Sequence, residues 1–539
     1  MPTLQRPYIS IDAPEQMCHS GWPDIGQALK EHLQRYQKKK LVLTVECYPG
    51  TYAGLDLLAL KKALAPDVIC QSDDLFLDEP ALRKAIPVPD PMAEGAQLPK
   101  SQDVEVLFDQ EKLRALRQTI EQLPRGLVLV HGVGAHHVWP SDLLVYSDVS
   151  RWELLQRMRR QELGNIGFAN KHISLAQRIT RAYFLDWPLA EQIKQDMLPE
   201  CHFYLEANNW QQPNLITGDI MRAGLAQASR HPLFMAPFFD PEIWTATDSI
   251  PKTPITTSFD LHPNTDNFLL KACHQLIEIP VRNILYLFPE ATVGEKKGAA
   301  IPSVFPFTLT HHTQLQKKEH LIFWHPGPAE LPDVSLHQHL IVLAARPQAT
   351  LLAGFHKNIS LVQKKHILQQ DVPRQFDWLE HLQQFPVDRF DCLSFPQSML
   401  HSTGSLADVL RISRIDEHWR QRIPQRLQDE AKITCPPEQA ALSDTYAGNP
   451  EKWTVGGQQS PVDQLCVMQH NLAQPPASIP HAGSFRVVCH LRGSDVLLDR
   501  GAAAPTRLHA GQLVVLPAAY QNAAWRSEGQ AELLMILDR

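Results

Sequence analysis

The sequence lacks several features, and each absence narrows the class of protein. None of its nine cysteines lies in a C-x-x-C pair, so we do not expect a thiolate metal cluster. Their odd number and scattered positions predict reduced thiols in a cytoplasmic protein, because a disulfide framework would use paired cysteines. No apolar run is long enough to cross a membrane, and no apolar segment follows a basic N-terminus. We therefore expect neither a membrane anchor nor secretion.

Excess basic charge is missing as well. Lys and Arg number 51 against 58 for Asp and Glu, and the net charge is −7. No global positive field would draw the chain to nucleic acid or to an acidic membrane. What is present is typical of a globular protein: the 539 residues, of which 44% are hydrophobic, suffice for about three domains. The 43 prolines favour a chain with many turns and short strands.

Apolar strands alternate with helices over residues 1–217. Such alternation predicts an α/β domain built on a parallel sheet. Strands are expected at residues 41–46, 67–71, 126–131, 142–147 and 202–205. Helices are expected at residues 24–39, 54–64, 109–122 and 151–161.

A P-loop domain would place its phosphate-binding loop directly after the first of these strands. Residues 47–54 (CYPGTYAG) supply Gly50 and Gly54 but no lysine for the phosphates, so we do not expect the usual ATP phosphoryl transfer. The helix at residues 151–161 carries four arginines: Arg151, Arg157, Arg159 and Arg160. Two interpretations stay open: the cluster binds phosphate, as kinase lid helices do, or it forms a salt-bridged, solvated face.

The pattern changes from residue 218 onward. A helix at residues 219–228 leads to a proline-rich border at 231–256, and short strands follow at intervals typical of an all-β sandwich or barrel. A helical insertion is expected at 406–432. Strands are expected at residues 268–271, 274–279, 283–288, 303–309, 321–324, 339–344, 350–353, 390–395, 485–491, 495–498, 512–516, 522–526 and 532–537.

Residues 386–401 (PVDRFDCLSFPQSMLH) read as a turn, a strand and a proline-led turn that ends at His401. Cupin β-barrels place a metal-binding histidine in this way, since proline fixes the backbone after the strand. A surface histidine without function is the alternative. Residues 508–517 (LHAGQLVVLP) have the form of a second cupin hairpin, but Tyr520 and Gln521 follow where a histidine is needed. We therefore expect a second barrel without metal.

The chain resembles the bacterial class I mannose-6-phosphate isomerases in which a nucleoside-kinase-like domain precedes a tandem-cupin isomerase. The resemblance implies a P-loop-kinase-like parallel α/β domain at residues 1–217 and a first cupin (double-stranded β-helix) barrel at 218–405. A helical insertion would follow at 406–450 and a metal-free cupin barrel at 451–539. The segments that carry it are LTVECYPG (43–50), VHGVGA (130–135), DLLVYSDVSRWELLQRMRRQE (142–162), AYFLDWPLAEQIK (182–194), APFFDPEIW (236–244), FPFTL (305–309), PVDRFDCLSFPQSMLHSTG (386–404) and LHAGQLVVLPAAY (508–520).

In the family, a Q-x-H-P pair, a glutamate and the histidine of the proline-led turn hold a catalytic zinc. The resemblance places that last histidine at His401 and the histidine of the pair at His325, where Phe323 replaces the glutamine. Gln338, flanked by His337 and His339, stands where the acid should be. The resemblance thus implies a Zn²⁺ site at His325, Gln338, His339 and His401, and without the acid His325, His401 and either His337 or His339 could still form a three-histidine site.

Aldose–ketose isomerisation moves a proton between adjacent carbons and needs a Lewis acid, a base and a cation for the phosphate. We expect interconversion of mannose 6-phosphate and fructose 6-phosphate, with Arg414 and Arg420 as candidates for that cation. The partner is a small sugar phosphate, and the sequence does not indicate an oligomeric state. Two alternatives remain: a catalytically lost relative that binds a sugar phosphate or a protein, and a kinase that uses the N-terminal domain.

Overall fold

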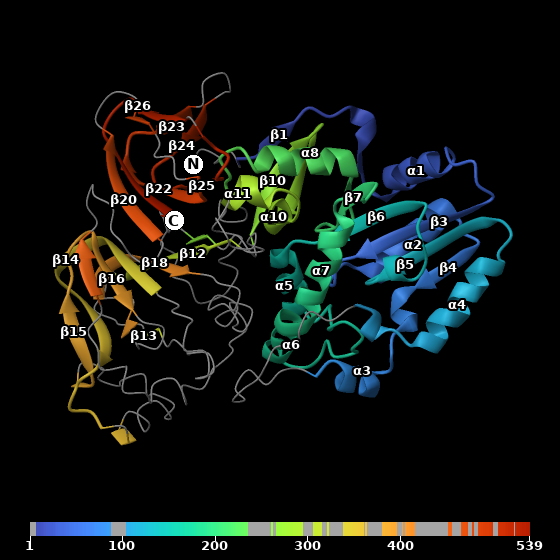
Figure 1. Cartoon of the computed structure of the whole chain (residues 1–539), viewed down its shortest axis with the longest axis horizontal. Helices are drawn as coiled ribbons and strands as arrows, with labels where there is room; N and C mark the ends of the chain where they lie inside the picture. Colours follow the sequence, from blue (N-terminus) through green and yellow to red (C-terminus); the bar gives the residue numbers. More distant parts are fainter. Residues whose placement is uncertain are drawn as a thin grey trace. The chain divides into compact units, whose positions relative to one another are not determined.

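A computed structural model describes most of the chain as two compact units (Figure 1). One unit is Met1–Ser229, Thr265–Phe288 and Arg420–Ile433, and the other is Arg230–Asn264, Pro289–Trp419 and Thr434–Arg539. The first unit therefore extends past the expected border at residue 217, and it also includes the later segment Thr265–Phe288. The described residues are 7–87, 104–235, 260–261, 266–294, 305–314, 321–322, 338–360, 362–363, 380–395, 401–402, 405–414, 451–454, 465–472, 477–478, 483–499, 505–521 and 523–538.

The first unit is built on a seven-stranded sheet of order β2-β8-β7-β6-β3-β5-β4. Five neighbouring strands are parallel, and they confirm the expected α/β domain. These strands are β3 (Lys40–Cys47), β4 (Val68–Gln71), β5 (Gly126–Gly132), β6 (Leu143–Asp148) and β7 (Phe203–Glu206). The edge strands β8 (Asn214–Thr217) and β2 (Cys18–Ser20) pair in the antiparallel sense.

Apolar residues on one stripe of each helix explain how the helices cover this sheet. In α1 (Trp22–Leu33), the buried residues Ile25, Leu29 and Leu33 recur every fourth position, and they join one core cluster with residues of β3, β5 and β6. The other helices of this unit are α2 (Ala53–Leu64), α3 (Glu79–Ala85), α4 (Gln110–Gln122), α5 (Arg151–Arg159), α6 (Leu175–Arg181), α7 (Trp187–Met197), α8 (Gly218–Ala228) and α10 (Arg282–Leu287). One π-helical turn, Ala182–Asp186, joins α6 to α7.

A three-stranded sheet brings a distant segment back to the first unit. It consists of β1 (Ile9–Ile11), β10 (Asn267–Ala272) and β11 (Gln275–Pro280). Helix α8 packs closely on it, because a Cβ added at Gly224 would lie 2.6 Å from Leu270 Cδ2. The strand expected at residues 283–288 is wrong, since helix α10 occupies that segment. Its sequence RNILYL is apolar enough for either element, and packing in the unit selects the helix.

A disulfide between Cys18 and Cys273 closes this sheet against the N-terminal segment, with a Cα–Cα distance of 6.6 Å. The expectation of reduced thiols is therefore wrong for these two residues. They are 255 positions apart, and only the fold brings them together. Cys47, Cys70, Cys201, Cys392 and Cys489 remain free and buried.

The second unit begins with a nine-stranded sheet organised around one long strand, β14 (Gln338–Phe355). This strand merges the two strands expected at 339–344 and 350–353. Strand β18 (Ser405–Arg414) pairs with β14 along its length, so the expectation of a helix from residue 406 is wrong up to 414, and the rest of that insertion lies outside the described residues. The other strands are β9 (Asp260–Leu261), β12 (Phe307–Gln314), β13 (Leu321–Ile322), β15 (Leu382–Pro386), β16 (Asp391–Phe395), β17 (His401–Ser402) and β19 (Glu451–Thr454).

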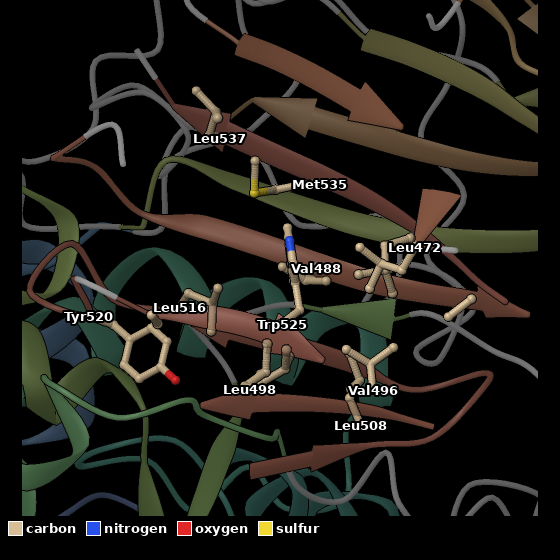
Figure 2. Packing of buried hydrophobic residues seen from close by; sticks show 14 of the residues in the cluster. Leu472, Val488, Val496, Leu498, Leu508, Leu516, Tyr520, Trp525, Met535 and Leu537 are labelled. Carbon is tan, nitrogen blue, oxygen red and sulfur yellow. The ribbon is translucent and has the colours of Figure 1, made fainter. Parts of the chain in front are cut away.

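Two four-stranded sheets complete the second unit and enclose one apolar core (Figure 2). The first has the order β20-β27-β22-β25, from Leu465–Leu472, Ala531–Asp538, Arg486–Gly493 and Leu513–Leu516. The second has the order β21-β26-β23-β24, from Ala477–Ser478, Ala524–Ser527, Val496–Asp499 and Thr506–Leu508. A short helix, α11 (Pro289–Val293), precedes them in the chain. No helix within the described ranges has both the length and the apolar character that a membrane crossing requires.

Candidate functional site

The structure places His401 on the core-facing side of the first β-rich sheet. Its side chain is 1% exposed, and its ring stacks on that of Phe395 with 4.2 Å between centroids and 7° between planes. In the ladder of β14 and β17, His401 lies opposite Ala353, which belongs to the same apolar cluster as Phe395. The imidazole is therefore held by packing against two neighbouring strands.

The strand position of Gln338 lies on this same face. Side chains alternate between the faces of a strand, and Leu340 and Val342, two and four positions on, belong to the apolar cluster. Gln338 is also the direct cross-strand partner of Phe395. The position of Gln338 and the ring of His401 are thus both neighbours of Phe395.

His339 is on the opposite face. It pairs with Ser394, and its Nδ1 lies 2.8 Å from the Ser394 hydroxyl, with the histidine 2% exposed. The sheet thus places the strand position of Gln338 and the ring of His401 beside Phe395, and it directs His339 to the opposite face. His325 and His337 lie outside the described residues.

Within the described part of the chain, no three His, Cys, Asp or Glu side chains lie close enough together to hold a metal ion. The donors that the described sheet does bring to one face are therefore one imidazole and one amide position. Zinc accepts nitrogen and oxygen ligands of both kinds. Of the expected ligands, the described residues supply the His401 imidazole, and a full ligand set would require His325 and the side chain of residue 338 as well.

A buried arginine that sequence reasoning missed lies on the same face. Arg411 is 5% exposed and pairs directly with Leu340, two cross-strand positions along from Gln338 and therefore on the same face. The Arg414 position falls on the other face of β18 by alternation, and Arg420 lies outside the described residues. Arg411 was overlooked because this segment was expected to be helical. If the segment had been recognised as a strand, the alternation of its side chains would have placed Arg411 on the inward face.

A second candidate site lies in the α/β unit, where ligands of such sheets usually bind. In the order β7-β6-β3-β5-β4, the chain leaves β3 toward β4 and leaves β6 toward β7, in opposite directions. Open α/β sheets bind ligands at the carboxyl ends of two strands whose connections diverge in this way. Tyr48 follows β3 and Asp148 ends β6, so both lie at this switch point.

A buried ion pair occupies one side of the switch point. Lys194 Nζ lies 2.9 Å from Asp148 Oδ1, and both side chains are 1% exposed. The Tyr204 hydroxyl donates to Asp148 Oδ2 over 2.8 Å, and the Asn283 amide lies 3.3 Å from the same oxygen. The carboxylate is therefore fully engaged by residues of α7, β7 and α10.

Glu191 forms the other side of this network. It accepts hydrogen bonds from Tyr48 over 2.8 Å, from Arg151 over 3.1 Å and from Tyr286 over 2.5 Å. Burial alone would raise the pKa of Glu191, but the cations Lys194, Arg282 and Arg151 outweigh it and lower the pKa to about 2. The carboxylate stays ionised, and the switch point is filled by the protein's own charges.

Arg157, one of the four arginines singled out in the sequence, holds the loop where a phosphate cradle would lie. Its guanidinium is fully buried and donates to the carbonyls of Gly50, Ala207 and Asn208 over 2.8 Å each. The side chain of Leu154 fills the remaining space, since a Cβ at Gly50 would meet it at 2.7 Å. Arg157 also pairs with Glu153 at 2.9 Å, and the 48% exposed Arg160 pairs with Glu153 and Glu162, so the salt-bridged interpretation is confirmed for these two arginines, although Arg157 is buried rather than solvated.

Comparison with known proteins gives one family and several solved structures. A model described as a domain of unknown function (DUF8485) matches residues 21–230, which lie within the α/β unit. No curated protein is similar enough to this chain to count as a match.

The solved structures include mannose 6-phosphate isomerases from two organisms. The apo enzyme from Salmonella typhimurium has 12% identity and a TM-score of 0.35, with 58% of this chain and 100% of that chain covered. The same enzyme bound to its substrate and zinc has 11% identity and a TM-score of 0.33, with 52% and 91% covered. The enzyme from Bacillus subtilis has 14% identity and a TM-score of 0.30, with 44% and 77% covered. TM-scores this low assign neither a fold nor an activity to this chain.

Proposed function

We propose that the β-rich unit is a cupin-type sugar-phosphate isomerase that interconverts mannose 6-phosphate and fructose 6-phosphate. The observation that carries the proposal is the common face of the first sheet, where His401 and the Gln338 position both adjoin Phe395. These are two of the positions that the sequence resemblance assigns to the metal. They come from different strands, as a site built in a barrel interior requires.

Zinc would be held by His401, Gln338 and His325. We leave His339 out of this set because its side chain lies on the opposite face of the sheet. When bound, zinc would supply a Lewis acid that polarises the sugar carbonyl. Gln338 replaces an acid with a neutral amide, so this ligand set would leave more positive charge on the site than the family pattern does.

Arg411 is the residue that we propose for the phosphate group. A guanidinium offers a planar set of donors that matches phosphate oxygens. Arg411 points to the same face as His401, and its burial keeps competing water away. Holding the phosphate there would orient the two sugar carbons between which the proton moves in the enediol mechanism. Arg420 remains a second candidate for this role.

For the α/β unit we propose a kinase-like ancestry without phosphoryl transfer. The parallel strands, whose connections diverge between β3 and β6 as in open nucleotide-binding sheets, support the ancestry. Arg157 and Leu154 support the loss of activity, since both take space that phosphates would need. In this proposal the domain has a structural role.

The test is metal content and turnover of the full-length protein. We expect about one zinc per chain and formation of fructose 6-phosphate from mannose 6-phosphate. His401→Ala should abolish both with the fold intact by circular dichroism. His339→Ala is the matched control, because it removes an equally buried imidazole from the opposite face. It should lower stability yet keep zinc and turnover, whereas equal losses in the two variants would contradict the proposed ligand set.

One observation favours a second function, a sugar-phosphate-binding protein without catalysis. The position of the family's charge-neutralising acid is an amide here, Gln338. If purified protein holds no metal, shows no turnover after zinc is added and is nevertheless stabilised by mannose 6-phosphate, this second function replaces the first. Absence of any stabilisation by the sugar phosphate would exclude both functions.

A further inference from the structure

Residues 266–288 join the α/β unit from a distant part of the chain. We call them the returning segment; they form the hairpin β10–β11 and the helix α10 that follows it. The chain on either side belongs to the other unit, since Arg230–Asn264 precedes the segment and Pro289–Trp419 follows it. The returning segment is therefore held in the α/β unit by its own contacts and not by continuity of the chain.

Helix α10 supplies part of the charged network at the switch point. The Asn283 amide, 0% exposed, donates to Asp148 Oδ2 over 3.3 Å, and the Tyr286 hydroxyl donates to Glu191 Oε2 over 2.5 Å. Arg282 is 7% exposed and adds a positive charge that acts on Glu191. These contacts tie α10 to β6 and α7 (Figure 1). The returning segment thus covers the edge of the sheet where ligands of such folds bind.

One covalent bond joins the returning segment to the rest of the unit. Cys273 lies in the two-residue turn of the hairpin, between Ala272 and Gln275, which pair with each other. Its disulfide partner Cys18 lies in β2, a strand of the seven-stranded sheet. The disulfide therefore links the two sheets of this unit. It holds the hairpin at the end opposite to α10, which follows after roughly 17 Å of strand.

Cys273 is the sulfur through which this bond can exchange with an external thiol. Cys18 is 8% exposed, whereas Cys273 is only half-buried and its neighbour His274 has an 88% exposed side chain. Access decides which sulfur of a disulfide is attacked. Cys273 also has a φ of 52°, a left-handed conformation that favours glycine. A cysteine at this position is therefore explained by the bond it makes and not by the turn.

The reduced form is also compatible with this fold. Cys273 Sγ lies 3.5 Å from the carbonyl oxygens of Ala13 and Pro14, and a thiol there would donate to either of them. The anchors that remain without the disulfide include three paired positions between β1 and β10, and the packing of Leu270 against Gly224. These anchors are short, so the returning segment can open without unfolding the seven-stranded sheet.

We propose that the Cys18–Cys273 disulfide is a reversible redox latch that holds the returning segment over the switch point. The thiolate of a small thiol such as glutathione attacks Cys273 Sγ, the bond to Cys18 breaks, and Cys18 leaves as a thiolate that takes up a proton. A second thiolate attacks the mixed disulfide and leaves with the first thiol as their disulfide, while Cys273 is released and protonated. Reduction frees α10 from Asp148 and Glu191, and oxidation restores the contacts. This latch does not depend on the proposed isomerase activity, which belongs to the other unit.

Hydrogen exchange of the full-length protein, followed by mass spectrometry, tests the latch. In oxidised protein, peptides from residues 266–288 should exchange about as slowly as those from β3. After reduction they should exchange about tenfold faster than β3 or more, because the returning segment then opens by itself. The comparison with β3 removes any uniform loss of stability. Cys18→Ser should show the reduced pattern both with and without reductant.

Thermodynamic linkage gives a second measurement. Since docking of α10 favours the disulfide in this proposal, weaker docking must favour the dithiol by the same factor. Tyr286→Phe removes one hydrogen bond between the returning segment and Glu191, so the ratio of disulfide to dithiol in a glutathione buffer should fall about tenfold. Tyr48→Phe is the matched control, because it removes a hydroxyl that donates to the same carboxylate from outside the segment. Its ratio should equal that of the natural protein.

Three results would overturn the proposal. The first is equal acceleration of exchange in residues 266–288 and in β3 on reduction, which would make the disulfide a passive crosslink. The second is a ratio of disulfide to dithiol that falls equally in Tyr286→Phe and Tyr48→Phe, or in neither, because α10 and the disulfide would then be uncoupled. The third is a disulfide that withstands a large excess of glutathione in the folded protein, which would exclude exchange at Cys273.

Discussion

Lys194 Nζ and Asp148 Oδ1 lie 2.9 Å apart in the core of the α/β unit, with each side chain 1% exposed. A buried ion pair gains little over an apolar pair, yet loss of one partner leaves an uncompensated charge without water. The remaining partners of Asp148, Tyr204 and Asn283, are neutral. They cannot replace the positive charge of the lysine. The first prediction follows from this imbalance.

Lys194→Met should destabilise the protein by about 3–5 kcal/mol, because Asp148 then stays charged and unpaired in a dry environment. Urea unfolding followed by circular dichroism measures the change. Arg83→Ala is the matched control: its pair with Glu79 is 62% and 41% exposed, so it should cost less than about 1 kcal/mol. Similar losses in both variants would show that the Lys194 pair is solvated in solution.

The buried carboxyl group of Asp56 predicts that the stability of the protein depends on pH. It is 1% exposed, its carboxylate oxygens have no hydrogen-bond partner among the described residues, and burial raises its pKa from 3.8 to about 7 against a lowering effect of Arg157. A folded-state pKa above the unfolded one means that stability falls as pH rises from 3.8 to about 7 and stays constant above that.

Asp56→Asn should therefore be more stable than the natural protein at pH 8, on the order of 2–4 kcal/mol, and nearly equal to it at pH 4. Thermal unfolding at the two pH values gives the comparison. Asp219→Asn, whose carboxylate is 86% exposed, serves as the control and should change little at either pH. A gain of the same size at both pH values would mean that ionisation of Asp56 is not its cause.

The α/β unit should not bind ATP. Arg157 holds the Gly50 carbonyl, and Leu154 lies against Gly50 itself, so the loop cannot open toward phosphates without breaking buried contacts. Ligands that bind the folded state raise its melting temperature with concentration. We expect no change in melting temperature with Mg-ATP up to concentrations far above those that saturate ordinary kinases. A rise that scales with ATP concentration would restore the kinase alternative.

The disulfide predicts a loss of stability on reduction. Cys18 and Cys273 are 255 positions apart, and closing so long a loop in the unfolded chain is worth roughly 3–5 kcal/mol. Cys18→Ser should lose this amount, and the double variant with Cys273→Ser should lose little more, since both changes break one bond. Peptide mass mapping without reductant checks the bond directly. Two free thiols there, or additive losses, would contradict it.

Local sequence patterns predicted most elements of the α/β unit within a few residues. Strand β3 was expected at 41–46 and spans Lys40–Cys47, and α2 was expected at 54–64 and spans Ala53–Leu64. These elements are encoded locally, because an unbroken apolar run and a helical stripe each fit one type of secondary structure. The errors fell where a short segment suits two types, as in α10 and the first part of β18.

The candidate site residues also divide into those that a local sequence pattern could reveal and those that it could not. The proline-led turn of residues 396–401 drew attention to His401, and the structure places that residue in the interior. Arg411 carried no such local signal. Its inward orientation depends on the register of β18 against β14, and a shift of one residue would direct it outward.

By itself the sequence determined the two kinds of architecture, the loss of a phosphate-loop lysine and the position of one buried histidine, because each depends on residues adjacent in the chain. Tertiary structure alone decided which residues meet. It joined Cys18 to Cys273, filled the sheet's switch point with Lys194 and Asp148, and set the ring of His470 beside that of Trp525. The reason is physical: contacts between distant segments depend on strand order and register, and neither is recorded in the local pattern of a sequence.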